Sequence, residues 1–193
     1  MYELIGENNL ENVRGQILKN RDITEDLLNV DENSVENYMN YDNIIEGCEL
    51  LMKHIDLGNK ILVIADSDVD GLTSASLLVN YLYREFPTAN IIMKHHEGKQ
   101  HGLSDDIIIR NDVNLVIVPD AGSNDKKQIK ELYDKGIEVL IIDHHELEGE
   151  YPQYGVLINN QTSSKVENKS LSGVGVVYKF LTAFAETYFL DYP

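Results

Sequence analysis

Three aspartates, Asp66, Asp68 and Asp70, directly follow an apolar run and precede a glycine. The run, residues 61–65, is short, continuous and rich in branched aliphatic side chains, which is typical of a buried strand in a parallel sheet. Helix-like sequence follows Gly71, so the carboxylates fall on the turn from a strand into a helix. Carboxylates this close raise each other's pKa unless a cation lies among them, and hard divalent cations prefer oxygen ligands. The triplet therefore predicts a metal site.

Two other interpretations of the aspartate triplet exist. The pattern Asp-x-Asp-x-Asp-Gly also begins the calcium-binding loop of an EF-hand. That loop requires a bidentate glutamate at its twelfth position, which is Leu77 here, and a helix before it, where this chain has a predicted strand. These differences argue against an EF-hand. When the triplet is taken alone, a solvated acidic turn stays an alternative.

Two further apolar runs, 115–118 and 137–142, also end in potential metal ligands. These ligands are Asp120 after the first run and Asp143, His144 and His145 after the second. Each group alone fits an ordinary turn equally well. The carboxyl ends of parallel strands, however, lie along one edge of a sheet, where open α/β sheets bind ligands. We therefore expect the groups from all three strand ends to meet in one metal centre.

Strand-like and helix-like segments alternate from residue 60 onward. Strands are expected at 61–65, 90–93, 115–118, 137–142 and 156–158. Helices are expected at 72–86, 105–110, 125–135 and within 172–189. Repeated strand–helix order with short connections predicts an α/β fold, with a parallel, Rossmann-like sheet and helices on both of its faces.

The first 59 residues have a different character. Apolar residues recur at helical spacing within 10–18, 23–28 and 44–55, whereas 32–43 is polar and loop-like. The amphipathic pattern of 44–55 includes Cys48 and stops near Gly58. We therefore predict a small helical amino-terminal cap, 1–59, followed by the α/β domain, 60–193.

The composition restricts the environment and the partners. The net charge is −17, unlike a basic nucleic-acid-binding surface. Such acidity repels a polyanion unless metals or another part of the molecule supply positive charge. A single cysteine excludes an internal disulfide and fits a reducing compartment. Because no stretch reaches the length of a membrane span and no signal-peptide pattern occurs, we expect no membrane partner.

Four stretches together resemble the DHH phosphoesterase superfamily, and within it the RecJ-like single-strand-specific exonucleases of bacteria and their phages. The stretches are Asp66-Ser67-Asp68-Val69-Asp70-Gly71, Pro119-Asp120-Ala121-Gly122, Asp143-His144-His145 and Ser172-Gly173-Val174-Gly175-Val176. The resemblance covers essentially the whole chain and implies that residues 60–193 form a DHH phosphoesterase domain. It also implies a substrate of single-stranded DNA or a short oligonucleotide, and a place in the bacterial cytoplasm, whether the protein is bacterial or phage-encoded.

The resemblance implies a ligand set for two ions, Mn²⁺ or Mg²⁺. Asp68, Asp70, Asp120 and His144 match metal ligands of the family, with Asp120 in the bridging, catalytic position. Asp66 matches an aspartate that the RecJ-like branch has in place of a histidine of small DHH phosphatases. Two bridged cations lower the pKa of a bound water and hold it for in-line attack on phosphorus.

The resemblance also implies contacts with the substrate. His145 matches a catalytic residue that contacts the scissile phosphate and assists proton transfer. Gly173 and Gly175 match a glycine-rich turn whose N–H groups approach phosphate oxygens, although a plain helix start explains them too. His101 stands where the family usually has tyrosine, and it and Lys94 are weaker candidates for phosphate contacts, in a stretch that equally fits a solvated loop.

Part of the family pattern is not found in this chain. RecJ-like proteins have a further metal-binding aspartate and a second, smaller DHH-associated domain downstream of the glycine-rich turn. We therefore expect the chain to be an amino-terminal part that is weakly active or inactive alone. Two other functions stay open: a DHH phosphodiesterase or phosphatase for short oligonucleotides, cyclic dinucleotides or pyrophosphate, and a degenerate, non-catalytic relative.

Overall fold

The computed structural model describes residues 6, 9, 11–24, 28–29, 31, 35–96, 98, 100–104 and 107–193. Contacts divide the chain into two compact units, Met1–Glu36 and Asn37–Pro193. In the first unit, helix α1 (Val13–Asn20) begins at Asn12, whose side chain accepts a hydrogen bond from the N–H of Gly15. The helix expected near 23–28 lies mostly outside the described residues. The predicted division after residue 59 stays a prediction.

The second unit contains one parallel sheet. Its elements in chain order are η2 (Tyr38–Asn40), α3 (Ile44–Asp56), β1 (Ile61–Ala65), α4 (Val69–Glu85), β2 (Ile91–His95), β3 (Leu115–Pro119), α5 (Lys126–Asp134), β4 (Glu138–Asp143), β5 (Val156–Asn159) and α6 (Gly173–Tyr188). The strands lie in the order β2-β1-β3-β4-β5, and every neighbouring pair is parallel. This confirms the predicted α/β fold. The order reverses between β1 and β3, where such sheets form a crevice for ligands.

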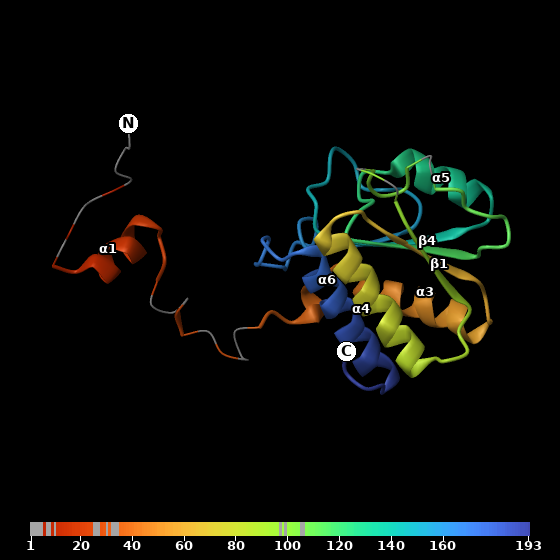
Figure 1. Ribbon diagram of the computed structural model, residues 1–193, viewed down its shortest axis with the longest axis horizontal. Coiled ribbons are helices and arrows are strands. Elements are labelled where there is room, and N and C mark those ends of the chain that lie inside the picture. The colour runs from red at the N-terminus through yellow and green to blue at the C-terminus, as the bar shows by residue number, and fades with distance from the viewer. Residues whose placement is uncertain are drawn as a thin grey trace. The chain divides into compact units, whose positions relative to one another are not determined.

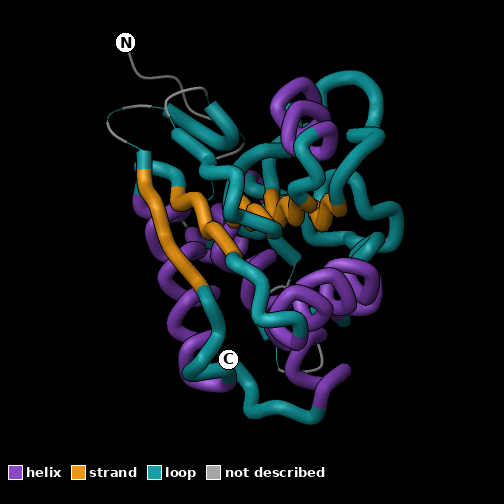
Figure 2. The backbone as a smooth tube through the Cα atoms, turned by 90° about the vertical axis from the view of Figure 1, so that its right-hand side faces the viewer, coloured by secondary structure: helices purple, strands orange, loops and turns teal. Residues whose placement is uncertain are grey.

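Strands β1, β3, β4 and β5 are almost entirely buried because helices cover both faces of the sheet, whereas the edge strand β2 is buried only in part (Figure 1; Figure 2). Successive side chains of a strand point to opposite faces. In β1, Ile61, Val63 and Ala65 join the core formed with α3, α4 and α6. Leu62 and Ile64 join the core formed with α5. Within the described ranges, no helix is long and apolar enough to cross a membrane.

Helix α3 packs closely on the sheet at Gly47, so we can predict how a larger side chain at this position changes the stability of the protein. A Cβ atom at Gly47 would lie 2.6 Å from Cδ1 of Ile158 and 3.3 Å from Cε2 of Phe180. In an exposed helix Gly→Ala stabilises by about 1 kcal/mol, but overpacking a core costs about 1–3 kcal/mol. We therefore expect Gly47→Ala to lower the urea midpoint of unfolding. The exposed change Glu49→Ala in the same helix serves as the control, and a more stable Gly47→Ala would contradict this packing.

The helix expected at 105–110 is wrong over its described part. Residues 105 and 106 lie outside the described residues, and 107–110 are not helical. Ile107 and Ile109 pack against the core under α5, whereas the side chain of Ile108 is 75% exposed. This alternation is the period of an extended chain, which the run of three isoleucines does not reveal by itself.

Candidate metal centre

The turn between β1 and α4 positions Asp66 and Asp68. Asp68 caps α4, and its Oδ1 accepts a hydrogen bond of 2.8 Å from the N–H of Gly71. Asp66 is buried, and its Oδ2 lies 2.5 Å from Nδ1 of His101. A Cβ atom on Gly71 would lie 2.4 Å from the Cβ of Asp66. Glycine is therefore required for α4 to begin so close to the buried carboxylate.

Asp120 follows β3 and is 1% exposed. Its φ of 77° places it in the left-handed region, which few residues other than glycine, asparagine and aspartate adopt readily. Among the described residues, none donates a hydrogen bond to its buried Oδ1. Burial, followed by the negative charges of Asp70 and Asp68, raises the pKa of Asp120 to about 8. A cation beside this carboxylate would remove both causes of the shift.

Asp143 at the end of β4 orients both histidines. Its Oδ1 accepts hydrogen bonds from the N–H groups of His144 and His145 and from Nδ1 of His145, and its Oδ2 accepts one from the N–H of Ser123. Burial alone would raise the pKa of Asp143, but the hydrogen bonds from His145 and Ser123 lower it to about 2. The hydrogen bond between the His145 ring and Asp143 raises the pKa of His145 to about 9. Both shifts favour the ion pair of the Asp143 carboxylate with the His145 imidazolium.

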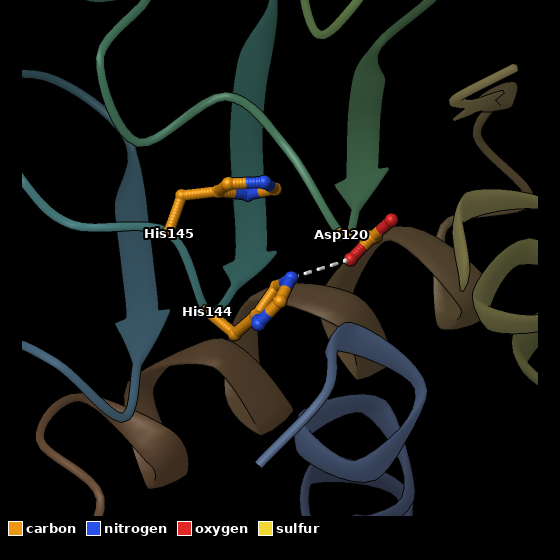
Figure 3. A group of neighbouring side chains, drawn as sticks. All are labelled: Asp120, His144 and His145. Atoms are coloured by element: carbon orange, nitrogen blue, oxygen red, sulfur yellow. Dashed lines mark ion pairs between the residues drawn. The ribbon is translucent and has the colours of Figure 1, made fainter. Parts of the chain in front are cut away.

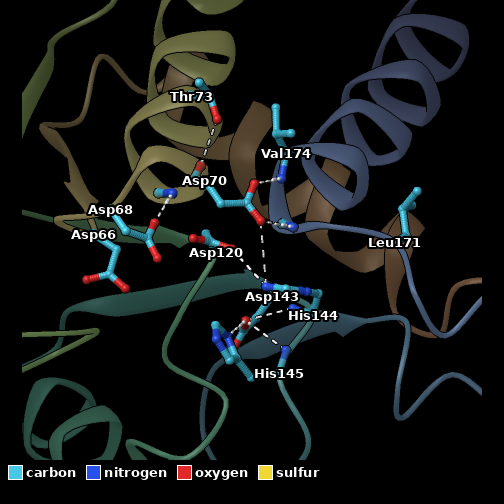
Figure 4. A network of polar contacts seen from close by, with 12 residues as sticks. Asp66, Asp68, Asp70, Thr73, Asp120, Asp143, His144, His145, Leu171 and Val174 are labelled. Atoms are coloured by element: carbon cyan, nitrogen blue, oxygen red, sulfur yellow. Dashed lines mark hydrogen bonds and ion pairs between the residues drawn. The ribbon is translucent and has the colours of Figure 1, made fainter. Parts of the chain in front are cut away.

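The side chains from the three strand ends meet at Asp120. Nε2 of His144 lies 3.2 Å from Oδ1 of Asp120 (Figure 3). Two groups, Asp66/Asp68/Asp120 and Asp120/His144/His145, each offer ligand atoms within 4.8 Å of one another. Both groups contain Asp120 (Figure 4), and their carboxylate and imidazole donors fit divalent cations such as Mn²⁺ or Mg²⁺. The ligand roles predicted for Asp66, Asp68, Asp70, Asp120 and His144 stay predictions, as does the catalytic role predicted for His145.

Asp70 lies outside both groups, although its Oδ2 lies 3.7 Å from Nε2 of His144, and it also contacts the start of α6. Its two carboxylate oxygens accept hydrogen bonds from the N–H groups of Gly173, at 2.8 Å, and Val174, at 2.9 Å (Figure 4). The N-terminus of a helix stabilises such a carboxylate. The Gly173 N–H that we predicted for phosphate therefore binds Asp70. A Cβ atom on Gly175 would lie 2.6 Å from Cγ of Leu171, so this glycine serves packing within the turn.

The two weaker phosphate candidates occupy different places. His101 lines a cavity of about 300 Å³ together with Asp66 and His145. Lys94 lies on β2, and its ammonium group donates to the carbonyl of Ile108 at 2.6 Å. It does not line that cavity. The structure thus brings His101, but not Lys94, to the metal centre.

The sequence analysis missed Asn159 and Gln161. Asn159 ends β5, is fully buried and donates to Oγ of Ser123 and to the carbonyl of His145. Gln161 donates to the carbonyl of His144 at 3.1 Å. The sequence held one signal for Asn159. This residue is an amide at the end of an apolar run, at the same edge of the sheet as the acidic groups.

Comparisons with known proteins show which family the chain resembles. Residues 60–191 match the model of the DHH family, N-terminal domain. The chain is 42% identical over 188 residues to YorK of Bacillus subtilis (strain 168), described as a prophage-derived single-strand DNA-specific exonuclease; the match covers 96% of this chain and 32% of YorK. It is 30% identical over 145 residues to the single-stranded-DNA-specific exonuclease RecJ of Haemophilus influenzae, covering 72% of this chain and 25% of RecJ.

Solved structures show the same likeness. The crystal structure of Thermus thermophilus RecJ in complex with Mn²⁺ matches with a TM-score of 0.66 and 25% identity, over 79% of this chain and 22% of that one. The chain thus spans about a third or less of the length of these relatives. The match of the family model to residues 60–191, together with the identity to YorK and RecJ, shows that the chain belongs to the DHH family and is RecJ-like.

Proposed function

We propose that this protein is a metal-dependent, RecJ-like exonuclease that hydrolyses the phosphodiester bonds of single-stranded DNA. The observation that supports this most is the sharing of Asp120 between two groups of metal-ligand atoms. Carboxylates with one imidazole suit Mn²⁺ or Mg²⁺, and the buried Oδ1 of Asp120 has no hydrogen bond to compete with a cation. The names of YorK and RecJ support single-stranded DNA as the substrate.

Each residue of the site has a role in this proposal. Cations bound here would supply a water of lowered pKa and would neutralise charge on the phosphate. Asp66, Asp68, Asp120 and His144 would hold the cations, and Asp120 belongs to both groups of ligand atoms. His145 keeps its Nδ1 on Asp143, so its Nε2–H is available to a phosphate oxygen or to the leaving group. No serine or cysteine nucleophile is needed.

The charge of the chain is consistent with this requirement for metal. With a net charge of −17, the protein repels DNA unless positive charge is present where the phosphate binds. Asp66, Asp68, Asp70 and Asp120 concentrate negative charge at that point. Two divalent cations would offset the charge of these four carboxylates and would place positive charge where a phosphate oxygen binds.

The test is hydrolysis of labelled single-stranded DNA by the purified protein with Mn²⁺ or Mg²⁺. We expect binding of Mn²⁺ and weak release of mononucleotides from one end, loss of this activity with a chelator, and recovery when Mn²⁺ is restored. Duplex DNA, dinucleotides and pyrophosphate are the parallel substrates. Cleavage of the short substrates alone would favour the small-substrate phosphodiesterase or phosphatase. Absence of both Mn²⁺ binding and hydrolysis would reject the proposed function.

A further inference from the structure

The side chain of Asn159 connects three loops at the carboxyl edge of the sheet. Its Nδ2 donates to Oγ of Ser123 at 2.8 Å, in the loop after β3, and to the carbonyl of His145 at 2.9 Å, in the loop after β4. Its Oδ1 accepts a hydrogen bond of 2.7 Å from the N–H of Gln161. Asn159 also pairs with Asp143 in the register of β4 and β5. All of these bonds form at a residue that is fully buried.

Asn159 and Asp143 bond different groups of His145. Asp143 fixes the N–H and the ring Nδ1 of His145, and Asn159 fixes its carbonyl oxygen. Ser123, the other partner of the Asn159 amide, donates its own N–H to Asp143. Asp143, His145, Ser123 and Asn159 therefore form a closed ring of hydrogen bonds, in which no member moves without breaking a bond.

The histidine that contacts Asp120 is held in a similar way. The side-chain amide of Gln161 donates to the carbonyl of His144, and the N–H of Gln161 is bound by Asn159. Two amide side chains after β5 thus hold the main chain of both histidines. Nε2 of His144 is thereby kept 3.2 Å from Asp120.

We propose that Asn159 is a positioning residue that fixes the main chain of His145 and, through Gln161, of His144, so that both imidazoles face Asp120. This inference rests on the proposed function, because it gives those imidazoles their purpose. A buried amide in a strand that is otherwise Val156-Leu157-Ile158 costs free energy unless all its polar groups are bonded. Outer partners that orient the ligands of a metal are worth about 10–100-fold in metal affinity or activity.

The neighbouring residue provides a matched control. Asn160 is also fully buried, but its amide reaches the carbonyls of Asn168 and Leu171, at 3.3 and 3.5 Å, and contacts neither histidine. If Asn159 only stabilised the fold, changes at 159 and 160 would have similar consequences. If it positions the histidines, only the change at 159 reaches the metal centre.

The experiment compares Asn159→Leu, which removes the hydrogen bonds at similar volume, Asn159→Ser, which keeps one donor, and Asn160→Ala. The measurements are the Mn²⁺ dissociation constant, the ring ¹⁵N signals of His144 and His145 in the metal-free protein, and kcat and KM on single-stranded DNA. We expect Asn159→Leu to weaken Mn²⁺ binding about 10–100-fold and to shift the ring signals of both histidines. We also expect it to lower kcat by a larger factor than the factor by which KM changes. Asn159→Ser recovers part of each effect, and Asn160→Ala lowers only the stability.

Each outcome either supports or overturns the positioning role of Asn159. Wild-type ring signals and Mn²⁺ affinity in both Asn159 variants, with a stability loss like that of Asn160→Ala, would overturn the positioning role. If Asn159→Leu does not fold, the same comparison is made with Asn159→Ser. If the wild-type protein neither binds Mn²⁺ nor cleaves DNA, the proposed function fails, and the ring signals of the metal-free variants still decide whether Asn159 orients the histidines.

Discussion

Replacing Asp120 with asparagine is expected to abolish metal-dependent hydrolysis, because Asp120 contributes to both groups of ligand atoms. Loss of an outer-shell partner typically costs about 10–100-fold, and loss of a shared ligand should exceed that range. Asparagine keeps the shape of the side chain and tolerates the left-handed backbone at this position. The measurements are Mn²⁺ affinity and turnover of single-stranded DNA, and unchanged turnover would rule out this centre.

The same substitution is expected to stabilise the metal-free protein. The folded-state pKa of Asp120, about 8, lies above its unfolded value of 3.8. The contribution of such a group to stability is fully present below the unfolded pKa and is lost as the pH rises through the folded pKa. Thermal unfolding of the metal-free wild type should therefore occur at lower temperature as the pH rises from about 4 to about 8. Asp120→Asn should show less of this decline and a higher melting temperature at neutral pH.

The control for Asp120→Asn is Asp56→Asn, at the exposed end of α3. It removes the same formal charge at a surface position, so we expect neither the loss of turnover nor the gain in stability. A lower melting temperature in metal-free Asp120→Asn than in the metal-free wild type would contradict the account of crowded, buried carboxylates.

Gly173→Ala is expected to disable the site without changing any ligand. A Cβ atom at this position would lie 1.8 Å from Oδ1 of Asp120 and 2.6 Å from its Cγ, far inside van der Waals contact. Either Asp120 or the start of α6 must move, and Asp120 is buried with its backbone already in an uncommon conformation. We expect a stability loss of about 1–3 kcal/mol and a fall in Mn²⁺ affinity of about 100-fold.

Val174→Ala tests the next residue of the same turn. It keeps the N–H that Asp70 binds, so Mn²⁺ affinity should stay close to the wild-type value. Calorimetric titration of Mn²⁺ into both variants separates the two effects. Equal affinities in Gly173→Ala and the wild type would show that the start of α6 does not control the position of Asp120.

The sheet was predictable because its strands are short and all except the edge strand β2 are almost entirely buried. The predicted strand 61–65 coincides with β1, and the other predicted strands agree with the structure to within two residues. Helix α4 begins at Val69, before the predicted 72, because the side chain of Asp68 caps it. The wrong helix at 105–110 came from isoleucines whose alternation between buried and exposed depends on contacts with the core under α5.

The meeting of Asp66, Asp68, Asp120 and His144 followed from topology, since the carboxyl ends of parallel strands share one edge. The contacts of Asp70 with the start of α6 could not be predicted from topology, because the N–H groups that it binds are 103 and 104 residues away.

The buried amides were missed for a similar reason. Asn159 and Gln161 hold the main chain of the histidines through hydrogen bonds. Main-chain carbonyls leave no trace in residue types, so no spacing in the sequence identifies the side chains that bind them.

The left-handed backbone at Asp120 also limits how this protein can diverge. Glutamate would keep the charge, but it is disfavoured at a φ of 77°, and its carboxylate would extend one methylene further. Asparagine and glycine fit the backbone, and each gives up the shared carboxylate. The easiest substitutions therefore preserve the architecture and remove the chemistry, so we expect inactive descendants of this domain to carry asparagine or glycine at the position of Asp120.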